Sequence, residues 1–106
     1  MSLDVDLILD GNCVFSYNIT HNLGHMARAV DLYEYLWRPE EIGIEKASRL
    51  GPILYDGLAR LISNESQCRH LSPENGWGTY EGLVKFVSEY LVACAKYPDA
   101  IIEVSR

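Results

Sequence analysis

The sequence has no long hydrophobic run and no excess of basic residues. None of its 106 residues falls in a run of about 18 apolar residues, so no membrane-spanning helix is expected. The opening segment Met1–Asp6 lacks the basic and long apolar regions of a signal peptide, which predicts a cytoplasmic protein. Nine basic and fifteen acidic residues give a net charge of −6, which repels nucleic-acid backbones. We therefore expect neither nucleic acid nor a membrane as a partner.

The sequence has few cysteines, and several common catalytic motifs are missing. The three cysteines, Cys13, Cys68 and Cys94, are odd in number and too widely spaced for a disulfide framework or a zinc site. Cys94 lies on an apolar helical face and is expected in the core, whereas Cys68 lies in a polar segment and is expected to be the more exposed thiol. Phosphate-loop, dinucleotide-binding and nucleophile-elbow motifs are missing. The sequence therefore assigns no catalytic residue, metal or cofactor.

What is present predicts one globular domain over residues 1–106. Hydrophobic residues make up 48% of the chain, enough for one core. Residues 3–10 alternate between apolar and polar side chains, and residues 13–19 are rich in β-forming types. Because Gly11-Asn12 between them is a turn signal, these segments predict a β-hairpin. Residues 100–104 predict a last short strand.

Three amphipathic helices are predicted between the hairpin and the last strand, because apolar residues recur at helical spacing in each segment. Threonines that can cap a helix and prolines that end one mark several boundaries. Gly51-Pro52 should kink the second helix or divide it into two short helices nearly in line. The expected ranges are Thr20 to about Trp37, about 41–63, and Thr79 to just before Pro98, with a long loop at 64–78.

The order β-β-α-α-α-β predicts an α+β fold of two layers. If the helices run up, down and up, the last strand can pair antiparallel with the first. The result is a three-stranded antiparallel sheet in the order 2-1-3, covered on one face by three helices. The face carrying Asp4, Asp6 and Asp10 should point to water. The residues expected in the core are Leu54, Leu58, Leu83, Val87 and Leu91.

Two histidines are candidates for chemistry. His21 and His25 are four residues apart, on one side of the first predicted helix and opposite its apolar stripe. That spacing suits two ligands of one metal, but zinc needs a third protein ligand and none is evident. We expect no tight zinc site. The two residues are interpreted either as surface histidines or, in an enzyme, as a base or metal ligand.

Two polar segments each precede a predicted helix. A helix start leaves amide groups without partners and attracts anions. In the up, down, up arrangement both starts lie at one end of the domain, which predicts a site for a phosphate or a nucleotide-like group. The alternative is that these residues only cap helices and that Trp77 closes the core. The candidate ligand-binding residues are Asn18, Thr20, His21 and Asn22 in the first segment, and Asn75, Gly76, Trp77, Thr79 and Tyr80 in the second.

A third candidate is the pair Trp37 and Arg38. Tryptophan and arginine together are favoured at interaction hot spots, so the pair is a candidate interaction surface. The other interpretation is that Trp37 closes the core and that Arg38 caps the last carbonyl groups of the helix. The sequence leaves both interpretations open.

Taken together, several segments resemble a family of short proteins of bacteriophages, prophages and bacteria. The resemblance extends over nearly the whole chain and implies a phage or mobile-element context, with an accessory role such as counter-defence or host takeover. It implies no particular activity. The segments that carry it are Met1–Val5, Asn18–Leu23 (NITHNL), Leu36–Pro39 (LWRP), Asn75–Glu81 (NGWGTYE) and Val104–Arg106.

The favoured hypothesis is a small non-catalytic binding protein that recognises a small anionic ligand or a host protein. One alternative is a small enzyme that uses His21 or His25 as a base or metal ligand. Another is a structural or assembly protein. A homodimer is a further expectation, and a large apolar surface paired in a dimer would favour the structural role.

Overall fold

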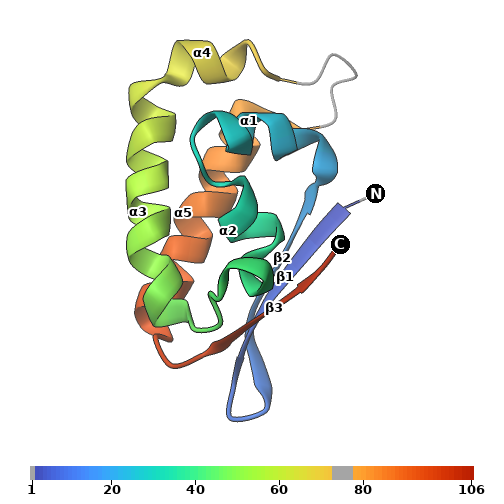
Figure 1. Ribbon diagram of the computed structural model, residues 1–106, viewed down its shortest axis with the longest axis vertical. Helices are drawn as coiled ribbons and strands as arrows, with labels where there is room; N and C mark the ends of the chain where they lie inside the picture. Colours follow the sequence, from blue (N-terminus) through green and yellow to red (C-terminus); the bar gives the residue numbers. More distant parts are fainter. Residues whose placement is uncertain (1, 73–77) are drawn as a thin grey trace.

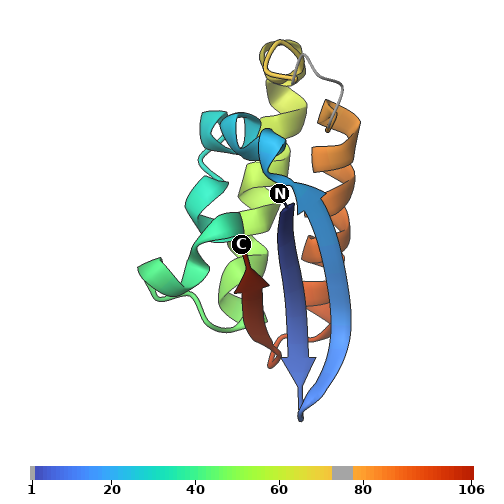
Figure 2. The same ribbon diagram turned by 90° about the vertical axis from the view of Figure 1, so that its right-hand side faces the viewer.

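The computed structural model describes residues 2–72 and 78–106, which form a sheet with helices on one of its faces (Figures 1 and 2). No helix in these two ranges is long and apolar enough to cross a membrane. The elements in chain order are β1 (Ser2–Leu9), β2 (Asn12–Thr20), the 3₁₀ helix η1 (His21–Leu23), α1 (Gly24–Ala29), α2 (Tyr33–Trp37), the 3₁₀ helix η2 (Pro39–Ile42), α3 (Ala47–Ser63), α4 (Glu65–Arg69), α5 (Tyr80–Lys96) and β3 (Ile101–Ser105).

The sheet has the predicted order β2-β1-β3, and both pairings are antiparallel. Asp10 and Gly11 form the hairpin turn with φ angles of 53° and 81°. Asp-Gly is a favoured pair in two-residue turns where both residues need positive φ. Leu7 pairs with Phe15 and Ile8 pairs with Cys13, so the strands shift register at this point. The turn therefore lies one residue earlier than Gly11-Asn12, and a β-bulge follows it.

The inner face of β1 forms one wall of the core. Leu3, Val5 and Leu7 are fully buried, whereas Asp4 on the opposite face is exposed. Large side chains from the helices complete the core, among them Leu50 and Leu54 of α3 and Phe86 and Tyr90 of α5. The predicted two-layer α+β arrangement is confirmed, with one face of the sheet turned to solvent.

The prediction of a single helix over residues 20–37 is wrong, because η1, α1 and α2 divide this segment. Asp31 adopts a left-handed conformation with φ 59°. The Leu32 amide donates to the Ala27 carbonyl at 2.8 Å, and the Asp31 amide donates to the Arg28 carbonyl at 3.1 Å. These two bonds form a Schellman motif, which ends α1. The apolar stripe nevertheless reaches the core in most places, since Leu23, Met26, Ala27, Val30 and Trp37 are all buried.

The second predicted helix begins later than residue 41. Residues 39–42 form η2, and α3 begins at Ala47, whose amide donates to the carbonyl of Ala100. Because the first amides of a helix have no partner within it, this bond and a similar one from Ser48 to Pro98 stabilise the start of α3. The helix then continues to Ser63 without a division at Gly51-Pro52 (Figure 1).

The core prediction is correct for three leucine or valine positions and wrong for two. Leu54, Leu83 and Val87 are fully buried, but Leu58 and Leu91 are only partly buried. Gly57 of α3 faces the core instead of Leu58. It packs so closely on Leu32 that a Cβ atom at this position would overlap the side-chain carbons of Leu32. Counting apolar side chains cannot assign a glycine to the core, and the prediction therefore included Leu58 in place of Gly57.

The predicted loop 64–78 contains a further helix, α4, and this changes the environment of Cys68. The thiol of Cys68 is buried, with 1% of the residue exposed, and its burial raises its pKa. The expectation that Cys68 is the more exposed thiol is therefore wrong, and the exposed cysteine is Cys13. Cys94 lies in the core as predicted.

Two buried tyrosines of α5 differ in their hydrogen bonding, and this predicts opposite effects of the same substitution. The Tyr80 hydroxyl donates to the Leu61 carbonyl at 2.8 Å, whereas the Tyr90 hydroxyl has no hydrogen-bond partner among the described residues. We expect Tyr90→Phe to raise the free energy of unfolding by about 1 kcal/mol, because a buried hydroxyl without a partner is unfavourable. Tyr80→Phe should lower it by about 0.5–1.5 kcal/mol. Urea denaturation of both variants checks the signs, and equal effects would contradict the assignment.

Candidate functional site

The end of β2 lies against the start of α5. This agrees with the prediction that the helix starts near Thr20 and Thr79 lie at one end of the domain. Gly78 has a φ of 99°, and a Cβ atom on it would lie 2.8 Å from Cγ2 of Thr20. The two segments border an open cavity of about 310 Å³. The residues that line it are Tyr17, Asn18, Ile19, Thr20, Leu23, Gly78, Thr79 and Gly82.

The polar residues around this cavity are largely engaged within the protein. The Thr20 hydroxyl accepts from the Asn22 amide at 3.2 Å, and the Thr79 hydroxyl accepts from the Gly82 amide at 2.9 Å. Both threonines therefore cap helices, as predicted. The side chain of Asn18 donates to Ser2 and Asp4 across the sheet instead of capping.

None of the remaining candidate ligand residues that the structure describes lines the cavity. Tyr80 is buried and hydrogen-bonded to Leu61, and the ring of His21 meets the ring of Trp37 edge-on, with 6.2 Å between ring centroids. Asn22 is exposed but does not line the cavity. Asn75, Gly76 and Trp77 lie outside the described residues.

The charge around the cavity does not favour an anion. None of the described lining residues carries a charge. Two carboxylates lie close to the lining: Asp4 accepts from Asn18, and Glu89 faces the Tyr17 hydroxyl. Burial and Glu89 together raise the pKa of Tyr17. An anion here would rely on backbone amides at the start of α5, because Arg69, which contacts Tyr80 and Glu81 there, already pairs with the carboxylates of Glu65 and Glu81.

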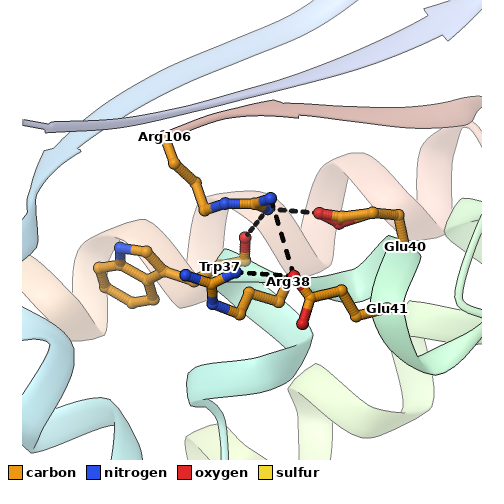
Figure 3. A network of polar contacts seen from close by, with 5 residues as sticks. All are labelled: Trp37, Arg38, Glu40, Glu41 and Arg106. Atoms are coloured by element: carbon orange, nitrogen blue, oxygen red, sulfur yellow. Dashed lines mark hydrogen bonds and ion pairs between the residues drawn. The ribbon is translucent and has the colours of Figure 1, made fainter.

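Trp37 and Arg38 belong to a second cluster, which joins the end of β3 to α2 and η2 (Figure 3). Trp37 is 1% exposed, so its ring closes the core and offers no surface to a partner. Arg38 pairs with Glu41 at 2.7 Å. Arg106 donates to the Trp37 carbonyl at 2.7 Å and also pairs with Glu40, which lowers the pKa of Glu40. The residue that caps α2 is thus Arg106, a long-range contact that the sequence does not reveal.

The two histidines lie in different helices and differ in exposure. His21 lies in η1 with its Nε2 atom buried and without a hydrogen-bond partner among the described residues, whereas His25 lies in α1 and is exposed. Residues 2–72 and 78–106 contain no group of three or more His, Cys, Asp or Glu side chains that could hold a metal ion. The structure thus offers no third ligand within these ranges.

A larger cavity, missed by sequence reasoning, lies between α3 and α5. This α3–α5 groove has a volume of about 560 Å³. Small residues on both helices, including Gly51 and Ala95, leave room for it, and Tyr55 stands at its side with 66% of its surface exposed. The available signal was Gly51-Pro52, which predicted a kink or a division of the helix. The lining residues are Ala47, Ser48, Gly51, Pro52, Tyr55, Asp56, Leu91, Cys94, Ala95 and Pro98.

The chemistry of the α3–α5 groove suits binding. Burial raises the pKa of the Cys94 thiol to about 12, so this thiol is protonated at neutral pH and is a poor nucleophile. The remaining lining is mostly apolar, with one carboxylate from Asp56. A concave apolar surface of several hundred Å³ with few polar groups is the usual form of a binding pocket.

Comparison of the chain with known protein families, curated proteins and solved structures finds no match.

Proposed function

We propose that this chain is a small non-catalytic binding protein that recognises a host protein through the α3–α5 groove. The observation that carries the proposal is an exposed tyrosine, Tyr55, beside an apolar groove between two helices of 17 residues each. Tyrosine is enriched at interface hot spots, because it offers a large apolar ring and a polar group. The resemblance to phage and prophage proteins supports a host protein as the partner.

The shape and charge of the groove favour an amphipathic, basic helix as the bound segment. Two neighbouring helices present ridges and a groove into which a third helix can place apolar side chains at positions i and i+4. Gly51 and Ala95 leave space for such side chains. The chain has a net charge of −6, and Asp56 lies in the groove, so basic residues beside the apolar stripe would be attracted.

The test compares two substitutions of exposed apolar residues. Tyr55 lines the groove, whereas Leu71, which is 40% exposed, lies outside it. The tagged chain of residues 1–106 is expressed in bacterial cells and captured together with its partner, and the affinity of the partner is then measured with purified proteins. We expect Tyr55→Asp to weaken binding by about 30-fold, a loss typical of a hot-spot residue, and Leu71→Asp to leave it unchanged.

Stability measurements accompany this comparison. Both side chains are exposed, so each substitution should change the free energy of unfolding by less than about 0.5 kcal/mol. A partner that binds Tyr55→Asp as tightly as the original protein would contradict the proposal. Equal loss of binding in both variants would contradict it as well.

A second candidate function is recognition of a small anionic ligand at the start of α5. The observation that favours it is the meeting of Thr20 with Gly78 and Thr79 around one cavity. In the same samples, inorganic phosphate and nucleotides are tested by thermal shift. A ligand at 100 times its dissociation constant stabilises a protein by about 2.7 kcal/mol. A rise in the unfolding temperature that corresponds to this stabilisation, and that is lost in Thr79→Val, would favour this second function over the first.

A further inference from the structure

The two edges of the sheet differ in how they are protected. At the β3 edge, Lys46 bridges to Ile101 and the Ile102 amide donates to the Glu45 carbonyl at 2.9 Å. At the other edge, no described residue pairs with the outer side of β2, which lies beside α5 (Figure 2). One edge strand is therefore partly covered and the other is open.

The open strand also lacks the features that usually prevent strands from pairing. Natural edge strands are commonly short, or they carry charged residues or proline. β2 is nine residues long, with the sequence NCVFSYNIT, and contains no charged residue and no proline. Its β-bulge lies close to the hairpin turn, so most of its length remains available for pairing.

An apolar surface continues from this strand onto α5. A cavity of about 380 Å³ lies between β2 and α5, with Val14 and Phe15 on one side and Val92 on the other. Val92 is 66% exposed. A strand that paired with β2 would approach this surface and cover it, which adds apolar burial to the main-chain hydrogen bonds.

We propose that the β2 edge pairs with β2 of a second copy of this chain, antiparallel and about a two-fold axis. The two sheets then become one six-stranded sheet, and the two α5 helices lie side by side. A strand without charges can face its own copy without bringing like charges together. This property distinguishes a second copy from a charged peptide as the occupant.

The charges along α5 fit the same two-fold arrangement. The ring of Tyr17 lies against that of Phe86, and the ring of Phe15 stacks on that of Tyr90, which places the middle of β2 level with residue 88 of α5. Lys85 and Glu89 are one helical turn apart and exposed. A two-fold axis near this level reverses the neighbouring helix and brings Lys85 of each copy close to Glu89 of the other.

Light scattering after size-exclusion chromatography tests the proposal with untagged protein. The expected mass is about 24 kDa, twice the 12.0 kDa of one chain. Ser16→Lys places a charge at the centre of the proposed pairing, beside Asp6 on the neighbouring strand of its own sheet, so the fold should be retained. We expect it to raise the dissociation constant of the dimer at least tenfold. The matched control is Ser66→Lys on α4, which should remain dimeric.

Exchanging the charges at positions 85 and 89 tests whether the dimer forms through this surface and not through another. Glu89→Lys should weaken the dimer, and Glu89→Lys combined with Lys85→Glu should restore it. A chain that is monomeric at all concentrations would overturn the proposal. So would a dimer that survives Ser16→Lys, a dimer that dissociates with Tyr55→Asp in the α3–α5 groove, or a double variant that stays as weak as Glu89→Lys.

Discussion

Leu54→Ala should lower the free energy of unfolding by about 2–5 kcal/mol, the range for enclosed leucines. Leu54 is fully buried in the part of α3 that faces the core. Truncation removes apolar contacts and leaves a cavity that the closely packed surroundings fill only in part. Urea denaturation measures the loss directly, because the described residues share one small hydrophobic core, for which a two-state transition is expected.

Leu58→Ala provides the matched comparison, because it makes the same chemical change one turn further along α3. Leu58 is only partly buried and packs at the edge of the core. Its truncation should therefore lower the stability by clearly less than truncation of Leu54. A larger loss for Leu58→Ala would mean that the core-facing side of α3 is assigned wrongly.

Gly57→Ala should destabilise the protein by about 1–3 kcal/mol, although alanine favours helices. A Cβ atom at this position would overlap Cγ, Cδ1 and Cδ2 of Leu32. Leu32 is fully buried, so its side chain can move away only by shifting within the packed core. Strain from overpacking should outweigh the gain in helix propensity.

Gly51→Ala is the control for this substitution, in the same helix. A Cβ atom at Gly51 would lie 3.7 Å from Cβ of Cys94, an ordinary contact. We expect this variant to change the free energy of unfolding by less than Gly57→Ala does, because the usual gain from replacing a helical glycine is opposed by contact of the new Cβ atom with Cδ of Pro52. Thermal unfolding of the two variants gives the comparison, and a stabilised Gly57→Ala would contradict the packing of α3 on Leu32.

Local sequence signals predicted much of the fold. Alternation in residues 3–10 placed β1 with its apolar face inward, and Thr20 and Thr79 cap helices as expected. The break at Asp31 could not be predicted in the same way. The apolar stripe is compatible with a continuous helix, and the break depends on the backbone conformation of one residue.

The candidate site was harder to predict because it depends on contacts between distant segments. The meeting of Thr20 and Thr79 followed from the predicted directions of the helices, and the structure brings these two residues to one cavity. The α3–α5 groove instead results from small side chains at positions such as Gly51 and Ala95, and a lack of side-chain volume produces no apolar periodicity. The contact of Arg106 with Trp37 spans 69 residues, and no local pattern indicates it.

The most direct test of the proposed function is site-specific photo-cross-linking from Tyr55 in living cells. A photoreactive amino acid replaces Tyr55 in one sample and Leu71 in another, since both side chains are exposed but only Tyr55 lines the α3–α5 groove. We predict one host protein cross-linked from position 55, through a basic amphipathic helix, and none from position 71. No adduct from position 55, or the same adducts from both positions, would contradict recognition through the groove.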